Sequence, residues 1–198
     1  RGLGDVYKRQ FLEITPDAQS AGMAGTGLAI TDNGSTAIFH NASTIAFSQD
    51  VMGASYSYAD INKDYGMHSA SLFYRIGREG KHGFTVGFRH YKDADFHWED
   101  GPKDHARAWN LEAAYFRNIA KNLSVSLTLR YLQAKAYKDA DSKGSVSMDF
   151  GASYHRSMAI LDEMASWTIG FQAANLGGKL DGQKPVSYTH LTLPTTSR

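Results

Sequence analysis

Residues 122–132 read NLSVSLTLRYL and alternate between apolar and polar side chains more regularly than any other stretch of the chain. From position 123 to position 131, every odd residue is apolar or aromatic and every even residue is Ser, Thr or Arg. Successive side chains of a β-strand point to opposite faces of its sheet, so this period of two predicts a strand with one apolar and one polar face. The fold depends on whether the apolar face contacts a protein core or lipid.

The same alternation recurs in six other segments, at residues 51–59, 68–76, 83–91, 109–117, 145–155 and 167–174. Most are about nine to eleven residues long, the length that a tilted strand needs to cross a bilayer. Aromatic residues lie at or near the ends of the apolar faces, as interfacial girdles do, at Tyr58, Tyr74, Trp109, Tyr115, Tyr131, Tyr154 and Trp167. The pattern predicts an all-β fold, an antiparallel transmembrane β-barrel, with about seven strands in residues 51–185. A soluble β-protein also alternates and is the alternative; in it, Leu123, Val125, Leu127 and Leu129 would pack against protein.

The segments between the predicted strands support the membrane interpretation. Residues 77–82 and 118–122 are short, whereas other links are long and rich in charge. Outer-membrane barrels alternate short periplasmic turns with long extracellular loops. This alternation predicts extracellular links at residues 60–67, 92–108 and 132–144. Residues 156–166 then become periplasmic, and their apolar side chains predict a short helix under the barrel.

The polar faces of the strands are expected to line the barrel lumen. Ser, Thr and Gly dominate these faces, and six positions carry ionisable side chains, namely Arg75, Arg89, Glu112, Arg130, Asp149 and His155. Removing an unpaired charge from water is costly. The lumen residues are therefore expected to pair with one another or to contact water.

The two ends of the chain are related to each other at the level of DNA. Residues 5–10 read DVYKRQ and residues 186–191 read VSYTHL. The DNA sequence GATGTGTATAAGAGACAG encodes the first peptide, and its reverse complement encodes VSYTH and the start of the following Leu codon. This DNA resembles the mosaic-end adapter of transposase-based sequencing libraries. We therefore expect residues 1–10 and 186–198 to be adapter-derived and leave them out of the fold prediction.

Charge and composition exclude several functions. Residues 11–185 contain 17 basic and 19 acidic residues, a net charge of −2. A nucleic-acid partner requires Lys and Arg clustered on one face, and none is expected here. The chain has no Cys, which excludes a disulfide framework, a Cys-ligated zinc and a thiol nucleophile. No apolar run approaches the roughly 18 residues of a transmembrane helix.

Residues 11–50 precede the first predicted strand and do not alternate well. Gly22, Gly25 and Gly27 match the spacing of neither G-x-G-x-x-G nor a P-loop, so close backbone packing is the preferred interpretation. The stretch contains the motifs FLEI at 11–14, PDAQ at 16–19, GMAG at 22–25 and HNAS at 40–43. In these motifs the chain resembles the PorV/PorQ outer-membrane proteins of the type IX secretion system, distant relatives of the FadL-type fatty-acid transporters. Two later segments are also similar, LEAAY at 111–115 and WTIGF at 167–171.

The resemblance implies a barrel of roughly fourteen strands in a Bacteroidetes-type bacterial outer membrane, of which about seven strands would form half. It implies that residues 11–50 form a plug or periplasmic segment, with plug or gate residues at Gly22, Met23, Gly25, His40 and Asn41. It also implies a function without cofactor or catalysis. The chain would bind secreted cargo proteins through their C-terminal signal domain, together with other secretion-system components, and pass them to surface attachment. A FadL-like transporter of hydrophobic small molecules is the alternative.

The long link at 92–108 holds the residues best suited to contact a partner. Aromatic side chains at a loop tip are favoured binding anchors, so Phe96 and Trp98 are predicted to bind cargo, although a place in the interfacial aromatic belt explains Trp98 as well. The Asp, Glu and His residues of this link follow no metal-ligand spacing. Residues 139–150 depart from an EF-hand because Phe150 stands where Glu is required. Neither a metal site nor a catalytic motif is predicted.

Overall fold

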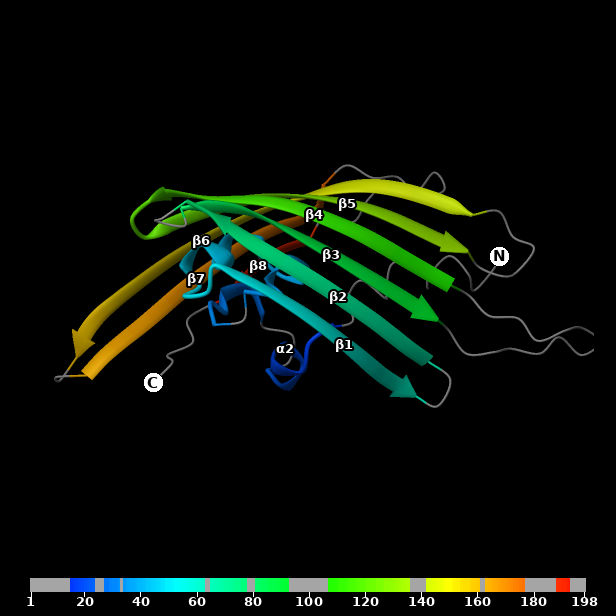
Figure 1. Cartoon of the computed structure of the whole chain (residues 1–198), viewed down its shortest axis with the longest axis horizontal. Coiled ribbons are helices and arrows are strands. Elements are labelled where there is room, and N and C mark those ends of the chain that lie inside the picture. Colours follow the sequence, from blue (N-terminus) through cyan, green and yellow to red (C-terminus); the bar gives the residue numbers. More distant parts are fainter. Residues whose placement is uncertain are drawn as a thin grey trace, which may run out of the picture.

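The computed structural model describes residues 15–23, 27–32, 34–62, 65–77, 81–92, 107–135, 142–160, 163–176 and 188–192. Within these residues eight strands form one sheet, and each strand pairs antiparallel with the next in sequence. The strands are β1 (Met52–Asn62), β2 (Tyr65–Ile76), β3 (His82–Lys92), β4 (Arg107–Ala120), β5 (Leu123–Lys135), β6 (Lys143–Ile160), β7 (Glu163–Leu176) and β8 (Tyr188–Thr192). The sheet is strongly curved, as Figure 1 shows.

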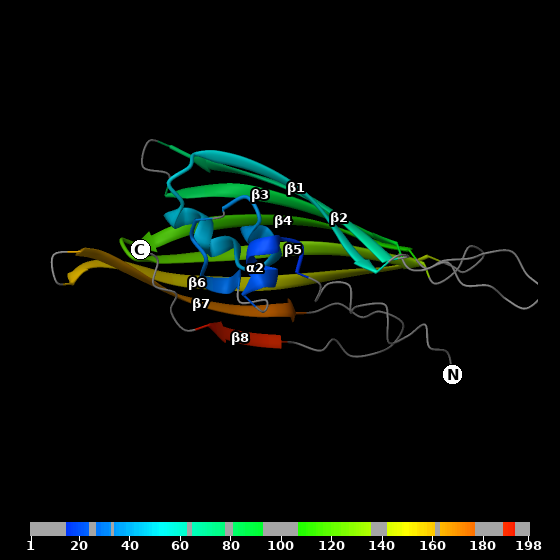
Figure 2. The same ribbon diagram turned by 90° about the horizontal axis from the view of Figure 1, so that it is seen from below.

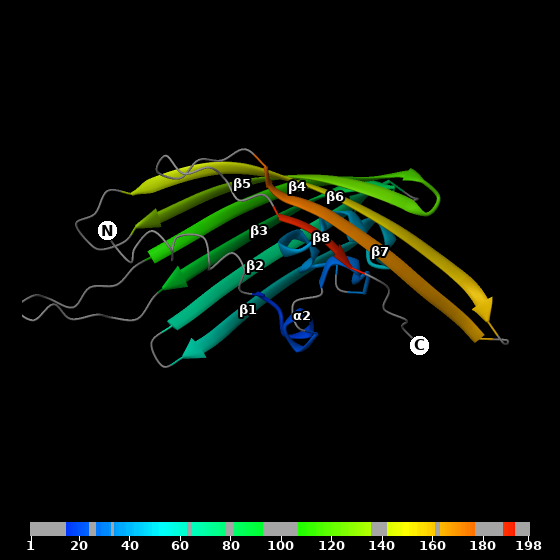
Figure 3. The ribbon, with the colours of Figure 1, turned by 180° about the vertical axis from the view of Figure 1, so that it is seen from behind.

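The seven predicted strands correspond to β1–β7, and the predicted antiparallel barrel fragment is confirmed as a curled half-barrel. β8 is an addition that pairs with residues 170–174 of β7, at the sheet edge seen from behind in Figure 3. It lies in the segment that the DNA argument assigns to an adapter. Main-chain hydrogen bonds can form a short edge strand from many sequences, so the adapter origin of residues 186–198 stays a prediction.

Two predicted links are wrong because the strands continue through them. β1 and β2 remain paired as far as Asn62 and Tyr65, which leaves two residues of the expected link 60–67 between them. β6 and β7 remain paired as far as Ile160 and Glu163, so most of residues 156–166 is strand and not helix. A helix this short is marginal by itself, whereas the extended hairpin satisfies the same main-chain groups through strand pairing.

The alternating links divide the sheet into two ends. The β2–β3, β4–β5 and β6–β7 connections lie at one end, which we call the short-link end. The other connections lie at the opposite end and include the links 93–106, 136–142 and 177–187, so we call it the long-link end. Except for the shorter first link, this is the predicted alternation of an outer-membrane barrel.

The apolar face of the sheet points away from the protein. Leu127 and Leu129 are 50% and 52% exposed, whereas Ser126 and Thr128 between and beside them are 4% exposed. Other strands expose their apolar side chains in the same way, at Leu72, Phe84, Val86, Phe88, Leu111, Val146, Met148 and Phe150. A soluble protein buries such a face. The soluble alternative is therefore wrong for this sheet, and the exposed face is the one suited to lipid.

Aromatic rings gather at both ends of this outer face. At the short-link end, Phe84 lies 5.1 Å from Tyr115 between ring centroids, and Tyr154 lies 5.3 Å from Trp167. At the long-link end, further pairs are Tyr58 with His68 at 4.7 Å and Trp109 with Tyr131 at 5.5 Å. Two aromatic levels separated by a mainly aliphatic band are the arrangement of interfacial girdles.

The concave face is covered by the N-terminal segment, residues 15–50. This segment forms short helical turns, α2 (Ala18–Gly22), η1 (Gly27–Ala29), η2 (Ala37–Phe39) and η3 (Ala42–Phe47), which lie against the sheet in Figure 2. The main buried apolar cluster joins η2 and η3 to the inner faces of β2 and β4, and it includes Ile38, Phe39, Ile45, Phe73 and Phe116. Within the described ranges, no helix is long and apolar enough to span a membrane.

Candidate functional site

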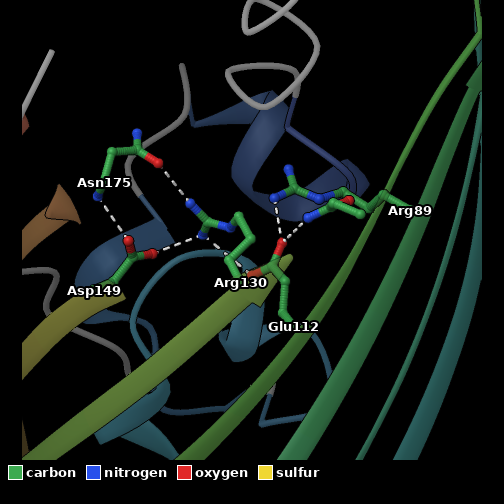
Figure 4. Close-up of polar contacts among 6 residues, drawn as sticks. Arg89, Glu112, Arg130, Asp149 and Asn175 are labelled. Carbon is green, nitrogen blue, oxygen red and sulfur yellow. Dashed lines mark hydrogen bonds and ion pairs between the residues drawn. The ribbon is translucent and has the colours of Figure 1, made fainter. Parts of the chain in front are cut away.

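Charged residues from four neighbouring strands meet on the concave face, as Figure 4 shows. Arg89 lies on β3, Glu112 on β4, Arg130 on β5 and Asp149 on β6. Strand register places Glu112 directly opposite Arg130 and places Asp149 diagonally from Arg130. Arg89 stands diagonally from Glu112 in the same way. Long side chains reach such diagonal neighbours across a sheet.

The four side chains form a continuous chain of ion pairs. Arg89 donates from Nη2 to Glu112 Oε1 at 2.5 Å, and Arg130 donates from Nη2 to Glu112 Oε2 at 3.2 Å. The same Arg130 nitrogen lies 2.6 Å from Asp149 Oδ2. Two amides join the network, and we define the inner charge cluster as Arg89, Asn110, Glu112, Arg130, Asp149 and Asn175.

The two amides occupy remaining hydrogen-bonding positions. Asn110 donates from Nδ2 to Glu112 Oε1 at 2.5 Å. Arg130 donates from Nη1 to Asn175 Oδ1 at 3.0 Å, and the Asn175 main-chain N–H donates to Asp149 Oδ1 at 2.7 Å. Asn175 has a positive φ of 59°, a conformation that Asn tolerates better than most residues. At the end of β7, the side-chain oxygen and the main-chain N–H of Asn175 therefore both face the cluster.

The cluster is removed from solvent and balanced in charge. The exposed fractions are 1% for Arg89, 0% for Glu112, 5% for Arg130 and 1% for Asp149. Since two cations face two carboxylates, the formal charges cancel, which the cost of dehydrating each ion requires. The cluster can hold four strands in register. It is too deeply buried to contact a protein partner directly.

The cluster also contacts the N-terminal segment. The Arg89 guanidinium carbon lies 5.1 Å from the centroid of the Phe39 ring, a cation–π arrangement. Both Ile38 and Phe39 lie against Gly87 of β3, where a Cβ would approach their side chains to 2.9 Å and 2.8 Å. Residue 87 is two positions from Arg89 on the same face. The N-terminal segment therefore lies directly beside the cluster, on the side of the short-link end.

Asn41 is the polar residue that joins this segment to the sheet. Its Nδ2 donates to the Leu28 carbonyl at 3.1 Å and to Ser153 Oγ of β6 at 3.0 Å. Its Oδ1 accepts from the Ser43 main-chain N–H at 3.2 Å, which makes it the N-cap of η3. A Cβ at Gly151 would lie 2.3 Å from Asn41 Oδ1. The close approach of segment and strand therefore requires Gly at position 151.

His40 ties the start of the segment to its middle. His40 Nε2 lies 2.6 Å from Asp17 Oδ2, and Asp17 Oδ1 accepts from the Ser20 main-chain N–H at 2.8 Å as the N-cap of α2. Burial alone would raise the pKa of Asp17. The hydrogen bonds from His40 and Ser20, with the charge of His40, outweigh burial and lower the pKa of Asp17 below its ordinary value.

The predicted plug and gate residues occupy different surroundings. His40 and Asn41 make the contacts described above. Gly22 ends α2 and has nothing within 4 Å of a Cβ built on it, so it is not needed for close packing, and Met23 follows it as the C-cap. Gly25 lies outside the described residues. Gly27 fits the packing interpretation, because a Cβ there would lie 2.7 Å from the His40 ring.

Two further predicted lumen residues contact the N-terminal segment and not the cluster. Arg75 of β2 donates from Nη1 to the Ser48 and Asp50 carbonyls, at 3.3 Å for Asp50. His155 of β6 stacks on Phe47 at 5.2 Å between centroids. The predicted cargo-binding residues Phe96 and Trp98 lie outside the described residues.

Asn110, Asn175 and Phe39 belong to the site but were not predicted as site residues. Asn110 had a usable signal, because it shares the polar face of its strand with Glu112. The other two had none, since the contact of Asn175 with Asp149 at the register shift between β6 and β7 and the ring above Arg89 depend on tertiary structure. Among the described residues, no three His, Asp or Glu side chains are grouped to hold a metal ion.

A curved antiparallel sheet with an apolar outer face and paired charges on its inner face defines a β-barrel protein of the outer-membrane class. The particular family follows from comparison with family models. The model described as type IX secretion system protein PorV matches residues 7–196. The chain belongs to the PorV family and is an outer-membrane component of the type IX secretion system. A comparison with curated proteins finds no match.

Proposed function

We propose that this chain binds secreted cargo proteins through their C-terminal signal domain and passes them to surface attachment. Membership of a secretion-system family supports this function. The observation that carries it is the direction of the exposed surfaces. The outer face of the sheet suits lipid and the N-terminal segment covers the inner face, so the two ends of the sheet remain for a protein partner. We place the partner at the long-link end, because outer-membrane barrels carry their long extracellular loops at one end.

The inner charge cluster supports this function by position. Arg89, Glu112, Arg130 and Asp149 tie β3–β6 together close to the ends from which the links 93–106 and 136–142 depart. Interface loops bind more tightly when a rigid support fixes their ends, because less conformational entropy is lost on binding. In this proposal Phe96 and Trp98 of the first of these links are the cargo anchors, and the cluster fixes the strands from which this link departs.

The N-terminal segment acts as a plug in the same proposal. Asn41 holds it to β6 and His40 holds its middle to its start, and Gly22, Met23 and Gly25 remain the other proposed plug or gate residues. This arrangement counts against the FadL-like transporter. A hydrophobic small molecule crossing the concave side would meet two buried Arg side chains and two buried carboxylates, and apolar groups gain nothing from such surroundings.

The test is capture by a cargo C-terminal domain immobilised on resin, using the full chain in mild detergent. We expect the wild-type chain to be captured and the double variant Phe96→Ala/Trp98→Ala to bind about tenfold or more weakly, as loss of a binding anchor does. The matched control is Phe84→Ala/Tyr115→Ala, which removes a contacting aromatic pair from the outer face at the opposite end. Absence of wild-type capture, combined with binding of radiolabelled oleate, would replace the proposal with the transporter.

A further inference from the structure

The polarity of the two faces of the sheet reverses at the long-link end. There the inner face carries a small buried apolar cluster, formed by Ala108, Leu132 and Ala134, with Tyr91 packed against it. The outer face, which is apolar over the middle of the sheet, carries cations at the same level, at Lys92, Arg107 and Lys135. Cations on a lipid-contacting face are costly at the bilayer centre and much less so at its edge. The reversal therefore marks the level at which the hydrocarbon layer ends.

The three cations form one row across three neighbouring strands. Lys92 of β3 is the register partner of Arg107 on β4, and Arg107 is the partner of Lys135 on β5. Paired Cα atoms of antiparallel strands are about 4.5–5.5 Å apart, so the three side chains start within about 10 Å of one another. Like charges at partner positions repel, so the contacts of these three cations with one another do not stabilise the sheet. We call Lys92, Arg107 and Lys135 the basic row.

An aromatic level lies immediately inside the basic row on the same face. Tyr58, His68, His90 and Trp109 occupy successive partner positions on β1–β4. A Cβ built at Gly66, which is the register partner of Lys92, would lie 2.8 Å from the Tyr58 hydroxyl. The hydroxyl of this ring therefore points toward the level of the cations. Amphipathic aromatic side chains take this orientation at the boundary between hydrocarbon and lipid headgroups.

We infer that the basic row binds the phosphate groups of an anionic lipid in the leaflet at the long-link end. Arg binds phosphate through two parallel N–H groups, and Lys binds it as a point charge. Asp60 of β1 is an acid at this level, and β2 lies between it and Lys92. The site rests on the outer-membrane placement of the family and is independent of cargo capture. It would fix the depth and tilt of this part of the barrel below the long links.

The test uses the full chain in uncharged detergent micelles, titrated with diphosphorylated lipid A or with its dephosphorylated form, with bound lipid counted by native mass spectrometry. A cation near an anionic membrane surface contributes about fivefold in affinity, so Lys92→Gln/Arg107→Gln/Lys135→Gln should weaken binding of the phosphorylated lipid on the order of a hundredfold. The control Arg117→Gln/Lys121→Gln/Arg156→Gln removes three exposed cations from the short-link end and should leave binding unchanged.

Two measurements on the wild-type chain test the site even if the triple variant does not fold. Raising salt from about 0.1 to 0.5 M should weaken binding of the phosphorylated lipid, because counter-ions screen exposed charges. The dephosphorylated lipid should bind weakly at both salt concentrations. Equal binding of the two lipids, no effect of salt, or equal loss in the two triple variants would overturn the proposal. Cargo capture by the same variants is measured separately, so failure of the lipid site leaves the cargo proposal standing.

Discussion

Glu112 is the residue on which the inner charge cluster depends most. Its carboxylate is 0% exposed and accepts from Arg89 at 2.5 Å, from Asn110 at 2.5 Å and from Arg130 at 3.2 Å. The variant Glu112→Ala leaves two buried guanidinium groups facing Asp149 as the remaining carboxylate of the cluster. Removing one partner of a buried ion pair costs about 3–5 kcal/mol, and we expect the free energy of unfolding to fall by this amount.

The assay is urea unfolding in detergent micelles, followed by tryptophan fluorescence. Leu111→Ala is the matched control, because Leu111 precedes Glu112 on the same strand but is 51% exposed on the outer face; its loss should stay within about 1 kcal/mol. The double variant Arg89→Met/Glu112→Leu removes one charge of each sign. Its loss should be smaller than the sum of the losses in Arg89→Met and Glu112→Leu, each made alone, by more than about 1 kcal/mol. Equal losses in Glu112→Ala and Leu111→Ala, or additive losses in the double variant, would refute the role of the ion pairs.

The remaining predictions concern the N-terminal segment and use limited proteolysis of residues 15–50 as the readout. Asn41→Ala removes the amide that joins the segment to β6, and a net loss of about 1–3 kcal/mol should accelerate cleavage about fivefold or more. Gly151→Ala should accelerate cleavage similarly, because its Cβ would lie 2.3 Å from Asn41 Oδ1. Gly22→Ala is the control and should not change the rate, because nothing lies within 4 Å of a Cβ there. Equal cleavage rates in the two Gly variants would contradict the packing argument. The folded-state pKa of Asp17 is lowered from 3.8, so its contribution to stability is complete above pH 3.8 and is lost as the pH falls through the lowered pKa. Cleavage by an acid-active protease should accelerate in that window, and Asp17→Asn should abolish this pH dependence; the same profile in both proteins would sink the prediction.

The strands and the direction of their faces could be predicted from the sequence because both follow from local alternation. Leu127 and Leu129 point outward and Thr128 points inward, as the alternation of their hydropathy predicts. The polar positions Arg89, Glu112, Arg130 and Asp149 were also predicted on the inner face by this period alone. Nothing in the alternation states which of these residues meet, since their pairing depends on the register of four strands.

Contacts between residues far apart in the chain could not be predicted from the sequence. Asn41 meets Ser153, more than a hundred residues away, and Phe39 meets Arg89. The β6–β7 hairpin was mistaken for a link because the apolar residues near 158–161 fit a short amphipathic helix as well as two paired strands. In the structure the segment forms paired strands and not a helix, as the pairing of Met158 with Ala165 shows.

The most direct test of a lipid-facing apolar surface is spin-label accessibility along the stretch NLSVSLTLRYL. The chain has no Cys, so Leu127→Cys, Thr128→Cys and Leu129→Cys can each carry a single nitroxide in lipid bilayers. Oxygen concentrates in hydrocarbon and a charged nickel complex stays in water. We expect oxygen to relax the labels at 127 and 129 far more than nickel does, and the label at 128 to show no such preference. Equal accessibility at all three positions, or stronger relaxation by nickel at 127 and 129, would contradict the membrane assignment.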